Sequence, residues 1–238
     1  MHEPVLWPEL SAQWGLSPQW AQWMDEREGS RCAWCWASLR SSSLAAAILA
    51  AVNSRHGTTA TRLKALFREP AARGLVVAEI NSAGNLHDVL ATCPGLRYSE
   101  FGQRKPGVEF QDLHALSYAD ASFDLLVTSD TLEHVPDVDR ALAEILRVLK
   151  PGGAHVFTTP VVWDRPTRQR ARLEDGKVVN LLAPSHHGGP GSGAEDFLVF
   201  YEFGADFPDL CTRAGFELEI RGDEANPALA AFIARRPA

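Results

Sequence analysis

The chain has 238 residues, of which 45% are apolar and 22% charged, and its formal net charge is −7. These values fit one soluble α/β domain with an appendage, and they exclude a disulfide-stapled mini-protein, a disordered chain and a coiled coil. An acidic chain lacks the positive field that attracts phosphate backbones, so we expect no nucleic-acid partner. No run of about 18 apolar residues and no secretory leader occurs, so we expect no membrane contact and a cytoplasmic location.

The N-terminal region is predicted to be a helical cap over residues 1–72. Six of the seven tryptophans lie within the first 36 residues. Three serines at 41–43 can cap a helix that continues through Ile48 and Val52, and a second helix is predicted over 59–67. Large aromatic side chains mainly supply buried area, so we expect them to bury the cap against the main domain. A lid over a substrate cleft is the alternative.

From residue 74 the pattern changes to alternating strands and helices. Apolar runs predict strands over 75–80, 96–99, 108–110, 123–129 and 154–159, with helices over 86–90 and 137–149 between them. The lysine, proline and two glycines at 150–153 are predicted to end the second of these helices. A helix over 206–214 and strands over 216–221 and 229–234 close the chain. Such alternation is typical of a parallel sheet covered by helices on both faces.

Residues 160–203 break this regularity and are predicted to form an insertion above the sheet. Asp175 and Gly176 lie between two short strand-like runs, which predicts a hairpin. Four arginines lie in this insertion. In an extended chain Arg168, Arg170 and Arg172 share one face and could bind a phosphate or carboxylate on a substrate, with Trp163 stacking on a ring. A solvated face neutralised by nearby acids is the alternative.

Acidic residues follow four of the predicted strands: Glu79, Glu100, Asp112 and Asp130. Ligands of doubly wound sheets bind beyond the carboxyl ends of the strands, where these side chains are expected to form a ring of nucleoside size. Glu100 comes about 20 residues after the first strand, where an acid commonly binds ribose hydroxyls. A solvated loop acid is the alternative for each residue taken alone.

Residues 76–160 resemble the class I S-adenosylmethionine-dependent methyltransferases. The most specific blocks are the segment at 112–124, the Ser-Asp-Thr-Leu-Glu-His-Val-Pro-Asp segment at 129–137 and the Glu-Ile-Leu-Arg-Val-Leu-Lys-Pro-Gly-Gly segment at 144–153. The resemblance implies an α/β fold with a Rossmann-like, seven-stranded, mostly parallel sheet over residues 73–238, whose last strand is antiparallel. The cap would precede this sheet, and the insertion would follow its fifth strand.

The resemblance also implies that S-adenosyl-L-methionine is the cofactor. Glu100 would hold both ribose hydroxyls, Asp112 the adenine amine, and the Leu113 backbone the ring. The residues implied near the methionine part are Glu79, Asn81, Ser82, Gly84 and Asp130. The sequence departs from the family here, because the usual glycine-rich turn reads Asn-Ser-Ala-Gly. Asparagine tolerates the left-handed backbone that glycine otherwise supplies.

Methyl transfer to a hydroxyl requires alignment of the acceptor and removal of a proton. His186 and His187 are the candidate bases, because they lie in the glycine-rich part of the insertion and imidazole titrates near neutral pH. Two solvated loop histidines are the alternative. His134 is expected to pack near the cofactor without taking a proton.

Cys32 and Cys35 form the only close cysteine pair. A structural zinc site needs about four ligands, and no second pair lies nearby in the sequence, so no metal is expected. Two reduced thiols are the favoured interpretation, with a redox pair as the alternative.

These observations predict a methyltransferase acting on a small-molecule or glycan acceptor, with oxygen as the expected methylated atom. One alternative is an enzyme that keeps the cofactor but catalyses another reaction. Another is an inactive interaction module that binds a partner through its tryptophans. The acceptor and the oligomeric state, with a homodimer as one option, are left open, because the cap and insertion lie outside the resemblance.

Overall fold

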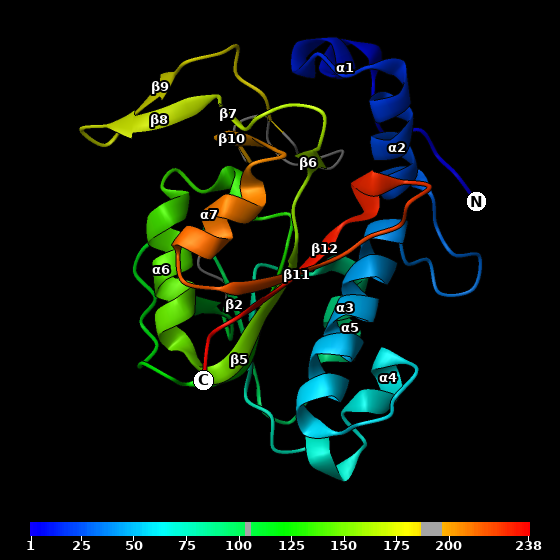
Figure 1. The fold of residues 1–238 in the computed structure, drawn as a ribbon, viewed down its shortest axis with the longest axis vertical. Coiled ribbons are helices and arrows are strands. Elements are labelled where there is room, and N and C mark those ends of the chain that lie inside the picture. The colour runs from blue at the N-terminus through cyan, green and yellow to red at the C-terminus, as the bar shows by residue number, and fades with distance from the viewer. Residues whose placement is uncertain (103–105, 187–196) are drawn as a thin grey trace.

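The computed structural model describes residues 1–102, 106–186 and 197–238, and its centre is a seven-stranded sheet (Figure 1). The strands are β1 (Val77–Ile80), β2 (Leu96–Glu100), β3 (Glu109–Phe110), β4 (Phe123–Ser129), β5 (Leu149–Thr158), β11 (Glu217–Arg221) and β12 (Ala231–Arg235). Their spatial order is β11-β12-β5-β4-β1-β2-β3. Neighbours pair in parallel from β5 to β3, and only the pairs made by β12 are antiparallel. The predicted fold class is therefore confirmed, including its antiparallel last strand.

The start of β5 differs from the prediction. The residues at 150–153 do not end a helix in a loop but lie inside β5, which begins at Leu149. Gly152 and Gly153 exchange backbone hydrogen bonds with Arg236, and the register between β4 and β5 shifts between Phe123 and Leu125. Backbone groups that find partners on both sides remain in a sheet even where the sequence is rich in turn residues.

Helices cover both faces of the sheet (Figure 1). One face packs against α6 (Val138–Val148) and α7 (Phe207–Arg213), and its core includes Ile80, Leu126 and Phe157. The other face packs against α3 (Leu39–His56), α4 (Leu63–Leu66) and α5 (His87–Leu90). Alternate residues of each strand point to opposite faces, and both faces are apolar, as expected for a parallel sheet between two helical layers.

The N-terminal helices divide between the sheet and the insertion. Although α3 belongs to the predicted cap, it packs directly against β5 and β12, and the predicted second cap helix shrinks to the single turn of α4. The first two helices, α1 (Pro8–Trp14) and α2 (Pro18–Gly29), instead pack against the insertion through Val162 and Val199. Trp14 and Trp20 are both 5% exposed, so burial against the rest of the chain accounts for these two tryptophans.

The insertion carries a small sheet and a projecting hairpin. Strands β6 (Val161–Val162), β10 (Tyr201–Gly204) and β7 (Arg168–Gln169) form the sheet, and β8 (Ala171–Glu174) pairs with β9 (Lys177–Asn180). Asp175 and Gly176 both have positive φ, as the predicted hairpin turn requires. No helix in the described ranges is long and apolar enough to cross a membrane.

A substitution at Gly95 tests how closely the backbones at the starts of β1 and β2 approach each other. A Cβ at Gly95 would lie 2.2 Å from the Leu75 carbonyl oxygen, whereas a Cβ at Gly74, the matched control, would meet nothing within 4 Å. Gly95→Ala should therefore lower the free energy of unfolding by about 2 kcal/mol, because the backbone must shift to relieve the overlap. Urea unfolding of both variants measures this, and equal stabilities would contradict it.

Candidate functional site

The carboxyl ends of four parallel strands meet at one edge of the sheet and bring the four predicted acids together. Glu79 pairs in register with Tyr98 on β2 and with Val127 on β4, and Glu100 pairs with Phe110 on β3. The chain order reverses between β1 and β4, the point at which such sheets bind ligands. The structure thus gathers Glu79, Glu100, Asp112 and Asp130 where the sequence predicted them.

The turn over residues 81–84, which follows β1, is built around a buried carboxylate. Glu79 is fully buried and accepts hydrogen bonds from the Ala83 backbone N–H at 2.8 Å and from His87 Nδ1 at 2.7 Å. Asn81 and Gly84 have φ values of 58° and 61°. Asn81 therefore adopts the left-handed backbone expected of asparagine. The buried Glu79 carboxylate fixes the turn through its hydrogen bond with the Ala83 N–H.

The next two strand ends carry the residues predicted to bind a nucleoside. The Asn81 side-chain oxygen accepts a hydrogen bond from the Phe101 N–H at 2.9 Å, which ties the 81–84 turn to β2. The Tyr98 hydroxyl donates a hydrogen bond to Glu100, and the rings of Phe101 and Phe110 lie 5.7 Å apart, both exposed. An acid beside exposed aromatic rings suits a ligand with hydroxyls and an aromatic base.

Asp112 and Leu113 differ in exposure. The Asp112 carboxylate is 37% exposed and accepts hydrogen bonds from the His114 backbone N–H and Nδ1. Leu113 is buried in the core beneath it. The turn therefore fixes the Asp112 carboxylate while leaving part of it accessible.

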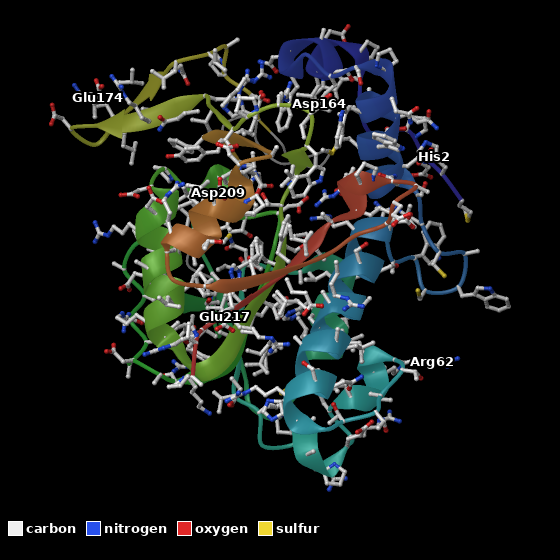
Figure 2. All side chains as sticks on the ribbon, in the orientation of Figure 1. His2, Arg62, Asp164, Glu174, Asp209 and Glu217 are labelled. Carbon is white, nitrogen blue, oxygen red and sulfur yellow. The ribbon has the colours of Figure 1, made fainter. Side chains whose placement is uncertain are left out.

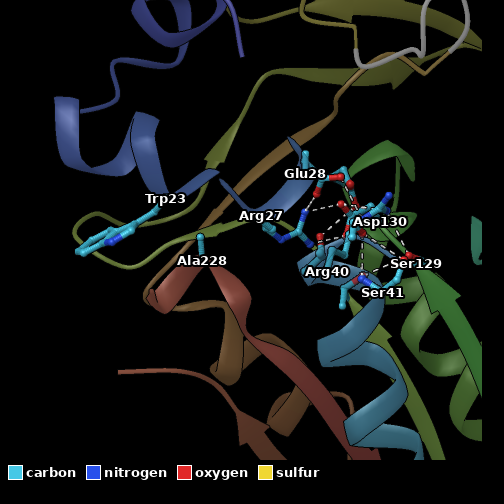
Figure 3. A network of polar contacts seen from close by, with 12 residues as sticks. Trp23, Arg27, Glu28, Arg40, Ser41, Ser129, Asp130 and Ala228 are labelled. Carbon is cyan, nitrogen blue, oxygen red and sulfur yellow. Dashed lines mark hydrogen bonds and ion pairs between the residues drawn. The ribbon is translucent and has the colours of Figure 1, made fainter. Parts of the chain in front are cut away.

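Asp130 forms ion pairs with two arginines of the N-terminal helices, and sequence reasoning missed this arrangement (Figure 3). Arg27, on α2, donates two hydrogen bonds of 2.6 Å to the two Asp130 oxygens. Arg40, on α3, lies 3.3 Å from Asp130 and 3.1 Å from Glu28, and Arg27 also pairs with Glu28. The Arg27 side chain is only 1% exposed. An acid that becomes buried needs a cation, but the sequence does not show which of its arginines supplies it.

Glu133 completes this group, which we call the Asp130 cluster: Arg27, Glu28, Arg40, Asp130 and Glu133. Burial, and then the charge of Asp130, raises the pKa of Glu133 from 4.5 to about 8. Glu133 Oε2 accepts a hydrogen bond from the Thr159 hydroxyl at 2.9 Å.

The charges of the Asp130 cluster balance when Glu133 is protonated. Burial by itself would raise the pKa of Asp130, but the charges of Arg27 and then Arg40 outweigh it and hold that pKa below its usual value. Asp130 and Glu28 then carry the two negative charges that match the two arginines. A neutral Glu133 is the state in which no buried charge lacks a partner.

The histidines predicted as bases lie in the insertion. His186 forms a β-bridge with Leu198, while His187 lies outside the described residues. His134 Nδ1 lies 3.0 Å from the Leu198 carbonyl oxygen, and burial lowers the pKa of His134. His134 is thus held as a neutral packing residue, and the role of His186 and His187 stays a prediction.

The arginines of the insertion form ion pairs with acids of the same insertion. Arg165, Arg168 and Arg170 converge on the fully buried carboxylate of Glu202, and Arg172 pairs with Glu174. Trp163 donates its indole N–H to the Pro227 carbonyl and packs against the core. These contacts form a structural ion-pair group around a buried carboxylate, which differs from the predicted phosphate-binding face and also from its solvated alternative.

Comparisons with known proteins match part of the chain to enzymes. Residues 73–157 match the family model described as "Methyltransferase domain". Dimethylglycine N-methyltransferase of Parasynechococcus marenigrum is 40% identical over 76 residues, which are 29% of this chain and 25% of that protein. Glycine/sarcosine/dimethylglycine N-methyltransferase of Actinopolyspora halophila is 30% identical over 128 residues, 52% of this chain and 21% of that protein. The matches therefore span about a quarter or less of these two relatives.

A solved structure covers the whole chain. The 1,6-didemethyltoxoflavin-N1-methyltransferase of Burkholderia thailandensis, with bound 1,6-didemethyltoxoflavin and S-adenosylhomocysteine, aligns with 100% of this chain and 94% of its own. The TM-score is 0.50 and the sequence identity is 16%, so this likeness concerns the fold.

The sheet order defines a Rossmann-like α/β protein, with acidic residues at the carboxyl ends of the strands on both sides of its switch point. Residues 73–157 match the methyltransferase-domain model, so the resemblance to S-adenosylmethionine-dependent methyltransferases is confirmed for this part of the chain.

Removing Arg27 tests the Asp130 cluster. Arg27→Met leaves Asp130 with Arg40 alone, and loss of one partner of a buried ion pair typically costs about 3 kcal/mol of stability. Arg62→Met is the control, because Arg62 is exposed and lies beside α4 (Figure 2), beyond the C-terminal end of α3, whereas Arg40 lies at the N-terminal end of that helix. Urea unfolding at neutral pH measures both, and an Arg27→Met variant as stable as the control would contradict the role of the pair.

Glu133→Gln tests the raised pKa. As pH rises from about 4.5 to about 8, the Glu133 carboxyl ionises in the unfolded chain but stays protonated in the folded one, so stability falls. The glutamine variant lacks this loss and keeps an oxygen that can accept the Thr159 bond. Its stability relative to the parent should therefore rise by up to about 1.4 kcal/mol per pH unit in that window. Urea unfolding at several pH values measures the difference, and a constant difference would contradict the shift.

Proposed function

We propose that the protein is an S-adenosylmethionine-dependent methyltransferase with a small-molecule or glycan acceptor. The observation that carries the proposal is the 81–84 turn, which combines two left-handed residues with open space where a Gly84 side chain would be. The turn lies at the switch point of the sheet, inside the matched methyltransferase domain. Such a turn lets a ligand approach the backbone closely.

The residues at the sheet edge fit the parts of this cofactor. Glu100 offers a carboxylate for the ribose hydroxyls, and the half-exposed Asp112 offers one for the adenine amine. Phe101 and Phe110 supply apolar rings for the base, and the Leu113 backbone borders the same region. Glu79, Asn81, Ser82 and Gly84 form the turn that would face the methionine part.

Asp130 would act at the methionine part together with its arginines. Its carboxylate is neutralised by Arg27 and Arg40, so it is no longer free to attract a cation by itself. Arg40 is the more accessible of the two arginines, with a side chain 25% exposed, and its Nη1 also donates to Ser129 at 3.1 Å. We expect Arg40 to meet the carboxylate of the methionine part, since a guanidinium suits such a group.

When bound, S-adenosylmethionine supplies a methyl group on a positively charged sulfur. The chain must align the acceptor and exclude water, and α1 and α2, held on the insertion by their buried tryptophans, would form part of that cover. His186 or His187 would take the proton of a hydroxyl acceptor. Oxygen remains the expected atom, although the relatives include enzymes named N-methyltransferases, so nitrogen is the alternative that the acceptor assay must separate.

The first experiment is a calorimetric titration with S-adenosylmethionine and, separately, S-adenosylhomocysteine. Micromolar binding of both would support the cofactor. Absence of binding at millimolar concentration would overturn the proposal and leave an interaction module with this fold. Binding without transfer to any hydroxylated or amine-bearing acceptor would favour an enzyme that uses the cofactor for another reaction.

Glu100→Ala tests the ribose contact. The variant should bind S-adenosylmethionine at least about tenfold more weakly, because a two-point hydrogen bond to the ribose is lost. Glu174→Ala, at the far tip of the hairpin (Figure 2), removes an exposed acid and should leave affinity unchanged. Calorimetry measures both, and equal affinities would remove Glu100 from the site.

A further inference from the structure

The loop over residues 31–38 joins α2 to α3 at the periphery of the molecule (Figure 1). Arg31 and Ser38 close its base as an antiparallel bridge. Inside it, the Cys32 N–H donates to the Ala37 carbonyl and the Trp36 N–H donates to the Cys32 carbonyl, both at 2.9 Å. The backbone therefore holds Cys32 and Cys35 on one short, closed loop.

Both cysteines of this loop are open to solvent. Cys32 and Cys35 are three positions apart, with a turn over residues 33–35, and both residues are exposed. Trp34, between them, is 96% exposed and does not cover them. The other two cysteines, Cys93 and Cys211, are buried. Small oxidants in solution can thus reach only the pair at 32 and 35.

Cys32 has the surroundings of a nucleophilic thiol. Hydrogen bonds from the Cys35 backbone, then from the Trp34 backbone and the Cys35 side chain, lower the pKa of Cys32 below its usual value. The thiolate is the form of cysteine that attacks disulfides, so a lowered pKa raises the reactive fraction at neutral pH. Burial instead raises the pKa of Cys93 and, to about 12, that of Cys211.

We propose that Cys32 and Cys35 are a thiol–disulfide exchange site for low-molecular-weight disulfides of the glutathione type. The Cys32 thiolate attacks one sulfur of the small disulfide, forming a mixed disulfide and releasing one small thiolate. Cys35 then loses its proton and attacks the Cys32 sulfur, which releases the second small thiolate. Two protein thiols are oxidised to one disulfide, and one small disulfide is reduced to two thiols.

This role takes up the redox alternative rather than the two reduced thiols favoured by the sequence, because the closed loop holds both cysteines exposed on one short turn. The exchange chemistry does not rest on the proposed function. The cysteine loop nevertheless contacts the segment that we propose to bind the cofactor. Asn85, the residue after the 81–84 turn, donates its side-chain amide to the Trp36 carbonyl at 3.3 Å. The cysteine loop is therefore one hydrogen bond away from the proposed cofactor turn.

The test incubates the reduced, full-length protein with glutathione disulfide and follows it by mass spectrometry. The parent should lose two hydrogens and retain no adduct, because Cys35 resolves the mixed disulfide. Cys35→Ser should retain one glutathione on Cys32, and Cys32→Ser should form an adduct at least about tenfold more slowly. Peptides that contain the buried Cys93 and Cys211 are the control in each sample, and they should stay unmodified.

A second measurement uses only the parent protein. Brief alkylation with iodoacetamide at neutral pH should label Cys32 ahead of Cys35. Equal reaction rates of the two serine variants, a stable glutathione adduct on the parent, no intramolecular disulfide, or faster labelling of Cys35 would each overturn the proposal.

Discussion

The bidentate ion pair between Arg27 and Asp130 fastens the N-terminal helices to the catalytic edge that we propose for the sheet. Arg27 lies on α2, which also packs on Val162 of the insertion and on Ala228 before β12, and Asp130 follows the central strand β4. Both partners lose water when the helix docks, so each charge depends on the other for its stabilisation. Placement of the cap over the strand ends therefore depends on this pair.

The Arg27–Asp130 ion pair also determines the protonation state of the neighbouring Glu133. With two arginines and two carboxylates already matched, an ionised Glu133 would add a buried negative charge beside Asp130. Raising its pKa avoids that cost. With Glu133 protonated, the charges of the Asp130 cluster nearly cancel at the methionine end of the proposed site. The acids that remain accessible, Glu100 and Asp112, lie at the end expected to bind the nucleoside.

The cap and the insertion form a second layer over this edge. Trp14 donates its indole N–H to Ser185, and the Glu202 carboxylate gathers three arginines beneath the hairpin. These contacts join segments about 170 and 35 residues apart in the chain. The cap and the insertion lie outside residues 73–157, which match the methyltransferase-domain model, so the acceptor that we propose cannot be assigned from that match.

The sequence by itself determined the sheet and the position of its acids. Strand and helix alternation, the strand-end positions of Glu79, Glu100, Asp112 and Asp130, and the hairpin at Asp175 all follow from local patterns that have a fixed period or turn chemistry. Only the tertiary structure decided which distant cations met those acids: Arg27 and Arg40 for Asp130, and three arginines for Glu202. It also kept residues 150–153 in β5, through bonds to Arg236 at the end of the chain. Ion pairs and strand edges join residues with no fixed spacing, whereas periodicity reports only on neighbours along the chain.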